Sequence, residues 1–396
     1  MSTLRAHLRD RSWLPFALLW IAGIDLRLTL LAVPPVLPLI HRDLRLGETG
    51  IAALTGLPVV LFAAAAVLGS LLVARLGPRR TMLLGLLGAG AASGLRGLGP
   101  SAAVLFLMTF VMGVGIAVIQ PAIPSLINQW CPTRVGRATA VYVNGLLVGE
   151  TLSASLTLPL ALPLAHGSWE LSLAFWAVPV LLTAPLLAWF APDLPQAGET
   201  PRVAWWPDWK GVDTWRLGLL LGGTGAVYFG SNAFIPEFLR TMGRPDLIGA
   251  GLTVLNAAQL PASLVAALVS GKAVGRRGPF LAIGVTMLCG LGVFLVGGDW
   301  GLVLAAGMLG VSCGFGLVFC LALPPALAGR EDVHRLSAGM LAIGYTYTFV
   351  APLLGGAAWD FTHVPGASLF PAACGALTIL AAASGLSMPP RGAGAA

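Results

Sequence analysis

Residues 20–40 read WIAGIDLRLTLLAVPPVLPLI, an apolar run long enough to cross a bilayer, with Asp25 and Arg27 near its middle. A membrane-spanning helix needs about 20 predominantly apolar residues. Similar runs recur along the chain, which has 396 residues, 57% of them hydrophobic and 10% charged. Soluble domains carry about 25% charged residues. The runs are also too long for the ~10-residue alternating strands of a membrane barrel. The sequence therefore predicts an all-α integral membrane protein.

Charged or Gly/Pro-rich breaks divide the apolar runs into twelve expected transmembrane helices. These spans cover residues 13–40, 48–74, 79–98, 101–128, 137–164, 168–191, 214–240, 247–272, 279–297, 300–327, 336–358 and 366–388. If the N-terminus is inside, most lysines and arginines fall in cytoplasmic segments, and the outer loops hold only Arg42, Arg45, Arg240 and Arg244. Positive charge concentrates on the cytoplasmic side. We therefore expect a multi-pass protein of the bacterial inner membrane with both termini in the cytoplasm.

The longest polar stretch, PDLPQAGETPRVAWWPDWKGVD (192–213), divides the chain into two related halves. Several residues recur at an offset of 198, namely Pro38 and Pro236, Leu54-Thr55 and Leu252-Thr253, Gly77 and Gly275, and Arg137 and Arg335. GVGIAVIQPAIP (113–124) likewise mirrors GFGLVFCLALPP (314–325). We expect two pseudo-symmetric six-helix bundles at 1–191 and 214–396, joined by a cytoplasmic linker at 192–213. Parallel repeats with a binding site between them near the membrane midplane are typical of transporters that rock between two states.

The two-by-six layout, with the basic loops RLGPRR (75–80) and GKAVGRRG (271–278), resembles the major facilitator superfamily. That family carries a Gly-x-x-x-Asp-Arg-x-Gly-Arg-Lys/Arg type of motif between its second and third spans. This chain departs from the motif, since Ala74 stands at the Asp position and Pro78 at an Arg position. The resemblance implies the major facilitator fold and a gating role for Arg75 and Arg79.

Within that superfamily, four stretches are similar to the group of cyanate permeases and 2-nitroimidazole transporters. They are LRLTLLAVPPVLP (26–38), ALTGLPVV (53–60), SGLRGLGP (93–100) and GVGIAVIQPAIPSLI (113–127), and NAAQLPASLVA (256–266) is a weaker fifth likeness. Membership of this group implies transport of a small planar solute that is anionic or carries a nitro group, such as cyanate.

Arg27 lies about 13 residues from either end of its expected span, about 20 Å at ~1.5 Å per residue, so its side chain cannot reach an interface. It must face a charged partner or a wet cavity, because a buried arginine is costly in a bilayer. One hypothesis is direct contact with an anionic substrate, since a guanidinium binds planar anions bidentately. The other is a structural ion pair. Asp25 is about 200° round the helix from Arg27, so Glu150 is better placed by depth to be that partner.

Glu150 in YVNGLLVGETLSAS (142–155) and Asp25 are therefore candidates for proton coupling or for an ion pair. A buried carboxylate can carry a coupling proton. Arg96 lies near the outer end of the third expected span. We expect its long side chain to snorkel to the interface, with a gating or structural role.

Several expected spans place polar side chains on one face at helical spacing. Such faces either line a cavity or hydrogen-bond to neighbouring helices, and both readings stay open here. We take as candidates for substrate binding, beside Arg27, the residues Gln120, Tyr228, Asn232, Asn256, Gln259, Tyr345 and Tyr347.

The sequence predicts a secondary active transporter of a small planar anion that works by alternating access, with Arg27 at the central site. Symport with a proton or anion exchange would drive import. The alternative is a proton-coupled drug or metabolite efflux pump in which Arg27 is only the structural partner of Glu150. The chain has no nucleophile–base pair, metal cluster or phosphate loop, so we expect no enzyme, catalytic residue, metal or cofactor. The basic residues are scattered and indicate no nucleic-acid partner. The expected partners are the solute, a proton and the lipid bilayer, and the expected state is a monomer.

Overall fold

The structure, a computed structural model, describes residues 13–46, 48–191, 204–296 and 298–385. Within these ranges the chain is helical almost throughout and has no strand. Most of the expected linker and both chain ends lie outside the described residues. Several of the arginines that the predicted orientation places in cytoplasmic segments also lie outside the described residues, namely Arg5, Arg9, Arg11, Arg202 and Arg391.

The six expected spans of the first half are present, four of them in two or more pieces. They are α2 (Leu14–Leu31) with α3 (Val33–Leu44), α4 (Glu48–Leu76), α5 (Pro78–Leu95), α6 (Ala102–Ile119) with α7 (Ala122–Trp130), α8 (Val135–Leu156) with the π-helical η1 (Thr157–Ala161) and α9 (Leu162–Leu164), and α10 (Trp169–Phe175) with α11 (Ala177–Phe190). The breaks before Pro34 and at Pro121 follow from the ring of proline, which clashes with the preceding turn and removes a backbone donor.

The second half repeats this pattern with six more spans. They are α12 (Val212–Thr241), η2 (Pro245–Leu247) leading into α13 (Ile248–Ala257) and α14 (Gln259–Ala273), α15 (Arg277–Val296), α16 (Asp299–Leu327), α17 (Val333–Thr362), and η3 (Pro365–Leu369) leading into α18 (Phe370–Ser384). The predicted all-α architecture of twelve spans is confirmed, with boundaries within a few residues of those expected.

Ten of the twelve spans are long and apolar enough to cross a membrane by length and composition, counted over the described residues. The other two are α5 and α12, which nevertheless pack within the bundles beside apolar helices. The helix α5 begins with Arg79 and Arg80, and α12 carries polar residues such as Tyr228, Ser231 and Asn232. These polar positions lower the hydropathy of both helices and are the ones that could serve function.

Helix packing follows the same order in the two halves. In the first half α2 packs on α8 and α11, α4 on α6, and α5 on α6 and α11; in the second half α12 packs on α17 and α18, α14 on α16, and α15 on α16 and α18. The loops after α4 and α14 also match, because Gly77 (φ 80°) and Gly275 (φ 85°) both adopt a positive φ that favours glycine. The sequence repeat thus corresponds to a repeat of packing.

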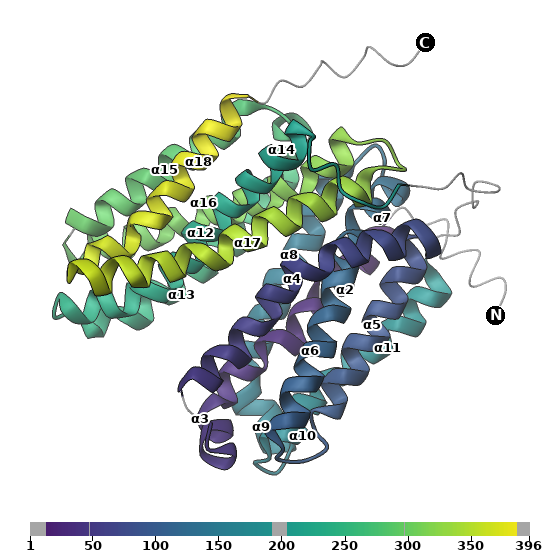
Figure 1. Ribbon diagram of the computed structural model, residues 1–396, viewed down its shortest axis with the longest axis horizontal. Coiled ribbons are helices and arrows are strands. Elements are labelled where there is room, and N and C mark those ends of the chain that lie inside the picture. Colours follow the sequence, from purple (N-terminus) through teal and green to yellow (C-terminus); the bar gives the residue numbers. More distant parts are fainter. Residues whose placement is uncertain (1–12, 47, 192–203, 297, 386–396) are drawn as a thin grey trace.

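The two halves converge at one end of the molecule and diverge at the other (Figure 1). We call the converging end, with α7 and residues 204–211, the linker end, and the opposite end, with α3, α10 and η2, the distal end. Hydrogen bonds join the halves on the linker side, since Asn128 Nδ2 donates to Pro325 O (2.7 Å) and Asn144 Nδ2 to Ser263 Oγ (3.1 Å).

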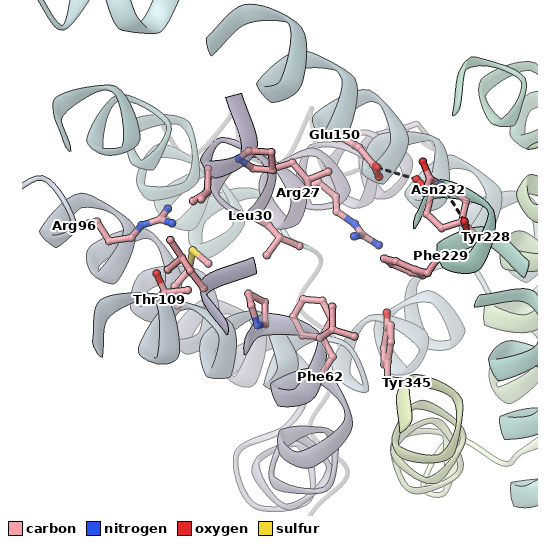
Figure 2. A pocket seen from close by; sticks show the side chains of 17 residues that line it. Arg27, Leu30, Phe62, Arg96, Thr109, Glu150, Tyr228, Phe229, Asn232 and Tyr345 are labelled. Carbon is pink, nitrogen blue, oxygen red and sulfur yellow. Dashed lines mark hydrogen bonds between the residues drawn. The ribbon is translucent and has the colours of Figure 1, made fainter. Parts of the chain in front are cut away.

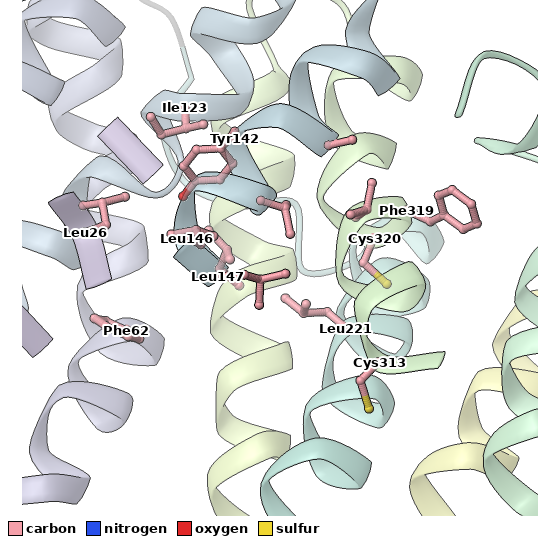
Figure 3. Close-up of a cluster of buried hydrophobic side chains, with 14 of the residues drawn as sticks. Leu26, Phe62, Ile123, Tyr142, Leu146, Leu147, Leu221, Cys313, Phe319 and Cys320 are labelled. Atoms are coloured by element: carbon pink, nitrogen blue, oxygen red, sulfur yellow. The ribbon is translucent and has the colours of Figure 1, made fainter. Parts of the chain in front are cut away.

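Apolar packing also joins the halves, as one buried cluster extends from the first half into the second (Figure 3). It includes Leu146 and Leu147 on α8, Leu221 on α12, and the buried free cysteines Cys313 and Cys320 on α16. Because this cluster runs through both bundles, the halves form a continuous core on the side where they converge.

Small residues bring α2 and α8 unusually close together. A Cβ atom added to Gly145 would collide with the backbone carbonyl of Trp20, and one added to Gly149 would collide with that of Ile24. Such close approach through small residues is characteristic of membrane helix pairs. Arg27 and Glu150 lie on this helix pair, Arg27 about one turn after Ile24 and Glu150 directly after Gly149, so their backbones are held in a fixed relation.

Candidate functional site

A cavity of about 260 Å³ lies between the halves (Figure 2). Its lining comes from α2, α3, α4, α6 and α8, from Arg96 at the end of α5, and from α12 and α17 of the second half. Most lining side chains are apolar. The charged and polar ones are Arg27, Arg96, Thr109, Glu150, Tyr228, Asn232 and Tyr345.

Arg27 projects from α2 with its guanidinium directed toward Phe229 and Tyr345 (Figure 2). It interacts electrostatically with Glu150 and with nearby tyrosines. No ion pair with a carboxylate within 4.0 Å and no hydrogen bond joins the Arg27 side chain to another described residue. A guanidinium has five N–H donors and no acceptor, so Arg27 holds donors that an anion in the cavity could use.

Glu150 is linked to the second half through Tyr228. The Tyr228 hydroxyl lies 3.1 Å from Glu150 Oε1 and 2.7 Å from Asn256 Oδ1, and both oxygens are acceptors in these contacts. One O–H can donate to only one of them at a time. Glu150, Tyr228 and Asn256 therefore form a chain of three hydrogen-bonding groups that runs from the first half into the second.

The amides of α12 and α13 complete this network. Asn256 Nδ2 donates to Asn232 Oδ1 (3.0 Å) and to Leu252 O (2.8 Å), while Asn232 Nδ2 donates to Tyr228 O (2.9 Å). Gln259 is buried and interacts with Tyr228. The sequence had left cavity lining and helix contact open for these amides. Asn232 does both, whereas Asn256 and Gln259 do not line the cavity.

A second contact links the halves at Tyr345 of α17. Its hydroxyl donates to Gln120 Oε1 (2.9 Å), at the break between α6 and α7. Its ring packs on Phe62 of α4, with ring centroids 5.3 Å apart. Tyr345 therefore bridges from the second half to two spans of the first half at the edge of the cavity.

Other candidates lie away from the cavity. Asp25 is buried on another side of α2, where it contacts Thr183 of α11. The Tyr347 hydroxyl lies 3.1 Å from Thr378 Oγ1 of α18. At the linker end, Arg75 is exposed and Arg79 Nη2 donates to Ala188 O (2.8 Å).

The expectation that Arg96 snorkels to the interface is wrong, because its side chain is fully buried. The helix α5 ends at Leu95, and Arg96 turns inward, where its Nη2 donates to Thr29 O (2.9 Å) and Ser93 Oγ (2.6 Å). A residue at the end of a helix can point inward or outward, and the packing of α2 against α5 decides which.

The sequence analysis missed the apolar lining, of which Leu30, Phe62, Met112 and Phe229 are examples. Leu30 could have been found, since it lies three positions after Arg27 and shares its helix face. Phe62 and Met112 carry no such signal, because in an apolar span they look like any lipid-facing or core residue.

Comparison with known proteins gives a family match over most of the chain. The model of the Major Facilitator Superfamily matches residues 18–356. The "Uncharacterized transporter YycB" of Bacillus subtilis is 30% identical over 359 residues, which cover 89% of this chain and 87% of that protein.

Two proteins of Escherichia coli are also similar. The "Cyanate transport protein CynX" is 28% identical over 348 residues, covering 84% of this chain and 87% of that protein. The "2-nitroimidazole transporter" is 28% identical over 286 residues, covering 69% and 70%. The resemblance to this group that the sequence motifs indicated is thereby confirmed.

Among solved structures, the transporter FucP in its outward conformation superimposes with a TM-score of 0.75 at 14% identity. The match covers 96% of this chain and 100% of that one. At this identity the likeness supports the fold alone, and that fold is the one with twelve helices in two bundles.

Proposed function

The chain belongs to the major facilitator superfamily of secondary transporters, and from this premise we propose that it carries a small planar anion or nitro-bearing solute, such as cyanate, by alternating access. The observation that carries the proposal is the Arg27 side chain, whose donors face the cavity without a hydrogen-bond partner among the described residues. A planar anion can accept two parallel hydrogen bonds from a guanidinium.

The size of the cavity favours a small solute. Its volume is about 260 Å³, below the ~300–1,000 Å³ of pockets that hold drug-sized ligands. The names of two relatives point the same way, since cyanate is a linear ion of three atoms and 2-nitroimidazole is a small planar ring. Gln120, Asn256 and Gln259 support the site by fixing Tyr345 and Tyr228, and Asn232 offers a further polar contact.

The orientation of the protein in the membrane indicates which conformational state of the transport cycle this is. With both termini in the cytoplasm, the linker end is the cytoplasmic end, and the contacts of Asn128 and Asn144 close the cavity on that side. We therefore propose that this state is outward-facing, with Arg75 and Arg79 near the cytoplasmic gate.

The membrane potential limits the ways in which the protein could import an anion. Moving a monovalent anion inward against an inside-negative potential costs about 2.3 kcal/mol per 100 mV. Import therefore needs either a steep concentration gradient or a coupled ion, and of these we propose proton symport or anion exchange. Glu150 is the proton site we favour, because it lies in the cavity beside Arg27 and contacts Tyr228 across the halves. Asp25 is the second candidate, buried outside the cavity. The transporter acts as a monomer in the bilayer.

The test is calorimetric binding of nitrate, nitrite, cyanate, small carboxylates and 2-nitroimidazole to the purified protein and to Arg27→Gln. We expect one of the small planar ligands to bind the wild type and to lose binding in the variant. The matched control is Arg80→Gln, which removes an exposed arginine at the start of α5 outside the cavity, and this variant should still bind. Failure of every ligand to bind, or equal binding by Arg27→Gln, would refute the proposal.

A second candidate function, proton-coupled efflux of a drug or metabolite, is favoured by one observation. Arg27 and Glu150 interact electrostatically, so Arg27 could serve only to balance Glu150. On this reading bulky neutral or cationic compounds bind, and Arg27→Lys keeps full activity because the charge is preserved.

A further inference from the structure

Arg96 is a buried cation with unused donors. Its side chain is 0% exposed, and its Nη2 donates to Thr29 O and Ser93 Oγ. The atoms Nε and Nη1 are buried and have no hydrogen-bond partner among the described residues. A buried donor that lacks a partner costs free energy, so an empty Arg96 site is unfavourable in this state.

The charge of Arg96 is also less balanced than that of Arg27. Arg27 has an electrostatic interaction with Glu150. Arg96 is buried, and no charged residue among those described has a comparable interaction with it. Asp25 lies one turn before Thr29 on α2, yet no N–O contact of 4.0 Å or less joins it to Arg96. An uncompensated charge in a buried site strongly favours a counter-ion.

Arg96 lines the same cavity as Arg27, and its guanidinium points toward the other lining side chains (Figure 2). Thr109 lines the cavity as well, and its hydroxyl is buried without a partner in the part of the chain that the structure describes. The hydroxyl of Thr29, next to the Arg96 contact, likewise has no partner within the described ranges. Hydroxyl and guanidinium donors together form the kind of group that binds a small anion.

We propose that Arg96 and Thr109 form a second anion subsite of the cavity, which binds a small monovalent anion on its way between the distal end and Arg27. The subsite lies on the distal side, because α5 starts near the linker end at Pro78 and Arg96 follows its last residue. The inference rests on the proposed function only in taking this cavity as the transport path.

The lining beside the two arginines is apolar, with Leu30, Leu31 and Met112 among its side chains. An anion gains little from such surfaces, so it rests at one arginine or the other. Two weak sites in series allow an ion to bind and still leave, as in other permeation paths. Arg96 therefore captures the anion, and Arg27 holds it for the change of state.

The direct test is anomalous diffraction from crystals of the protein soaked in sodium bromide, since bromide is a small monovalent anion whose position can be seen. We expect one bromide peak at Arg96 and one at Arg27. Arg96→Gln should lose the first peak and keep the second, and Thr109→Val, which removes only the hydroxyl, should weaken the first. Thr139→Val is the matched control, because it removes a buried hydroxyl of α8 that does not line the cavity, so both peaks should remain.

A transport measurement separates a subsite on the path from a resident chloride ion. In chloride-free proteoliposomes, Arg96→Gln should raise the KM for nitrate counterflow about tenfold, with the melting temperature measured as a check on folding. Thr109→Val repeats the test without any change of charge. A wild-type KM in both variants would overturn the subsite.

The outcomes distinguish this inference from the proposed function. A peak at Arg27 with none at Arg96 in the wild type overturns the second subsite and leaves the proposed function standing. A peak at Arg96 alone, with nitrate binding unaffected by Arg27→Gln, supports the subsite and refutes the central role of Arg27.

Discussion

A guanidinium at the centre of a bilayer costs about 2.5–3.5 kcal/mol on insertion scales, so Arg27 needs a compensating interaction. The structure offers Glu150 as an electrostatic partner but no direct contact. This arrangement balances part of the charge and leaves the donors available. It is what a binding site requires, because a fully engaged ion pair would have to break before an anion could bind.

Arg27→Lys tests whether geometry as well as charge matters. Lysine keeps the positive charge but lacks the planar fork that binds two oxygens at once. Loss of one charge-assisted hydrogen bond, ~1.5–3 kcal/mol, predicts binding of a planar anion weakened about 10- to 100-fold. Isothermal titration calorimetry with the ligand identified for the wild type measures this directly. Unchanged affinity would show that charge alone suffices and would favour the efflux reading.

Two tyrosines give a matched pair of tests. Tyr228→Phe removes the hydroxyl between Glu150 and Asn256. We expect transport in proteoliposomes to slow about 2- to 10-fold, because that factor corresponds to the free energy of one hydrogen bond. Tyr347→Phe removes a hydroxyl that faces Thr378, outside the cavity, and should transport as the wild type does. Equal loss in both variants would mean that the network through Tyr228 has no special role.

At the scale of elements, the contact between α2 and α8 positions the site. Gly145 and Gly149 let the backbone of α8 touch that of α2, and Gly23 does the same from α2 against Tyr142. Without these glycines the helices would lie farther apart. The distance between Arg27 and Glu150 would then change, although neither residue had been altered.

Gly149→Ala is therefore expected to lower the melting temperature of the protein in detergent. The added methyl group meets the backbone carbonyl of Ile24, which cannot move aside without shifting the helix, and such overpacking costs about 1–3 kcal/mol. Gly88→Ala on α5 is the control, because a Cβ atom there meets nothing within 4 Å. If both variants melt alike, close approach of α2 and α8 is not needed for stability.

At the scale of the whole molecule, the two halves meet on the linker side and share a cavity beyond that contact. The contacts that close this side come from pairs related by the repeat, α8 with α14 and α4 with α17. Alternating access requires these contacts to separate when the distal side closes. The linker-side contacts should therefore be present in one state of the cycle only.

A disulfide across this contact should stop the cycle. Gly136 of α8 packs directly on Ser270 of α14, so Gly136→Cys with Ser270→Cys, in a protein freed of its native cysteines, should cross-link without substrate. We expect transport to be lost on oxidation and restored by a reductant, with both single variants active. Full transport by the cross-linked protein would contradict alternating access at this interface.

The sequence by itself determined the twelve spans, the repeat and the candidate residues at mid-membrane depth. These features are local, because the length and hydropathy of a run and the position of a charge within it need no knowledge of neighbouring helices. Arg27 and Glu150 could be singled out in this way, since each is a charge too far from either interface to reach it.

Only the tertiary structure decided which of the polar candidates meet. Two residues two positions apart on a helix point to nearly opposite sides, so Tyr345 faces Gln120 of the other half while Tyr347 faces Thr378. Likewise, Arg96 turns into the cavity because α2 lies against the end of α5. Contacts between spans so distant in sequence depend on how the bundles pack, and no local pattern encodes them.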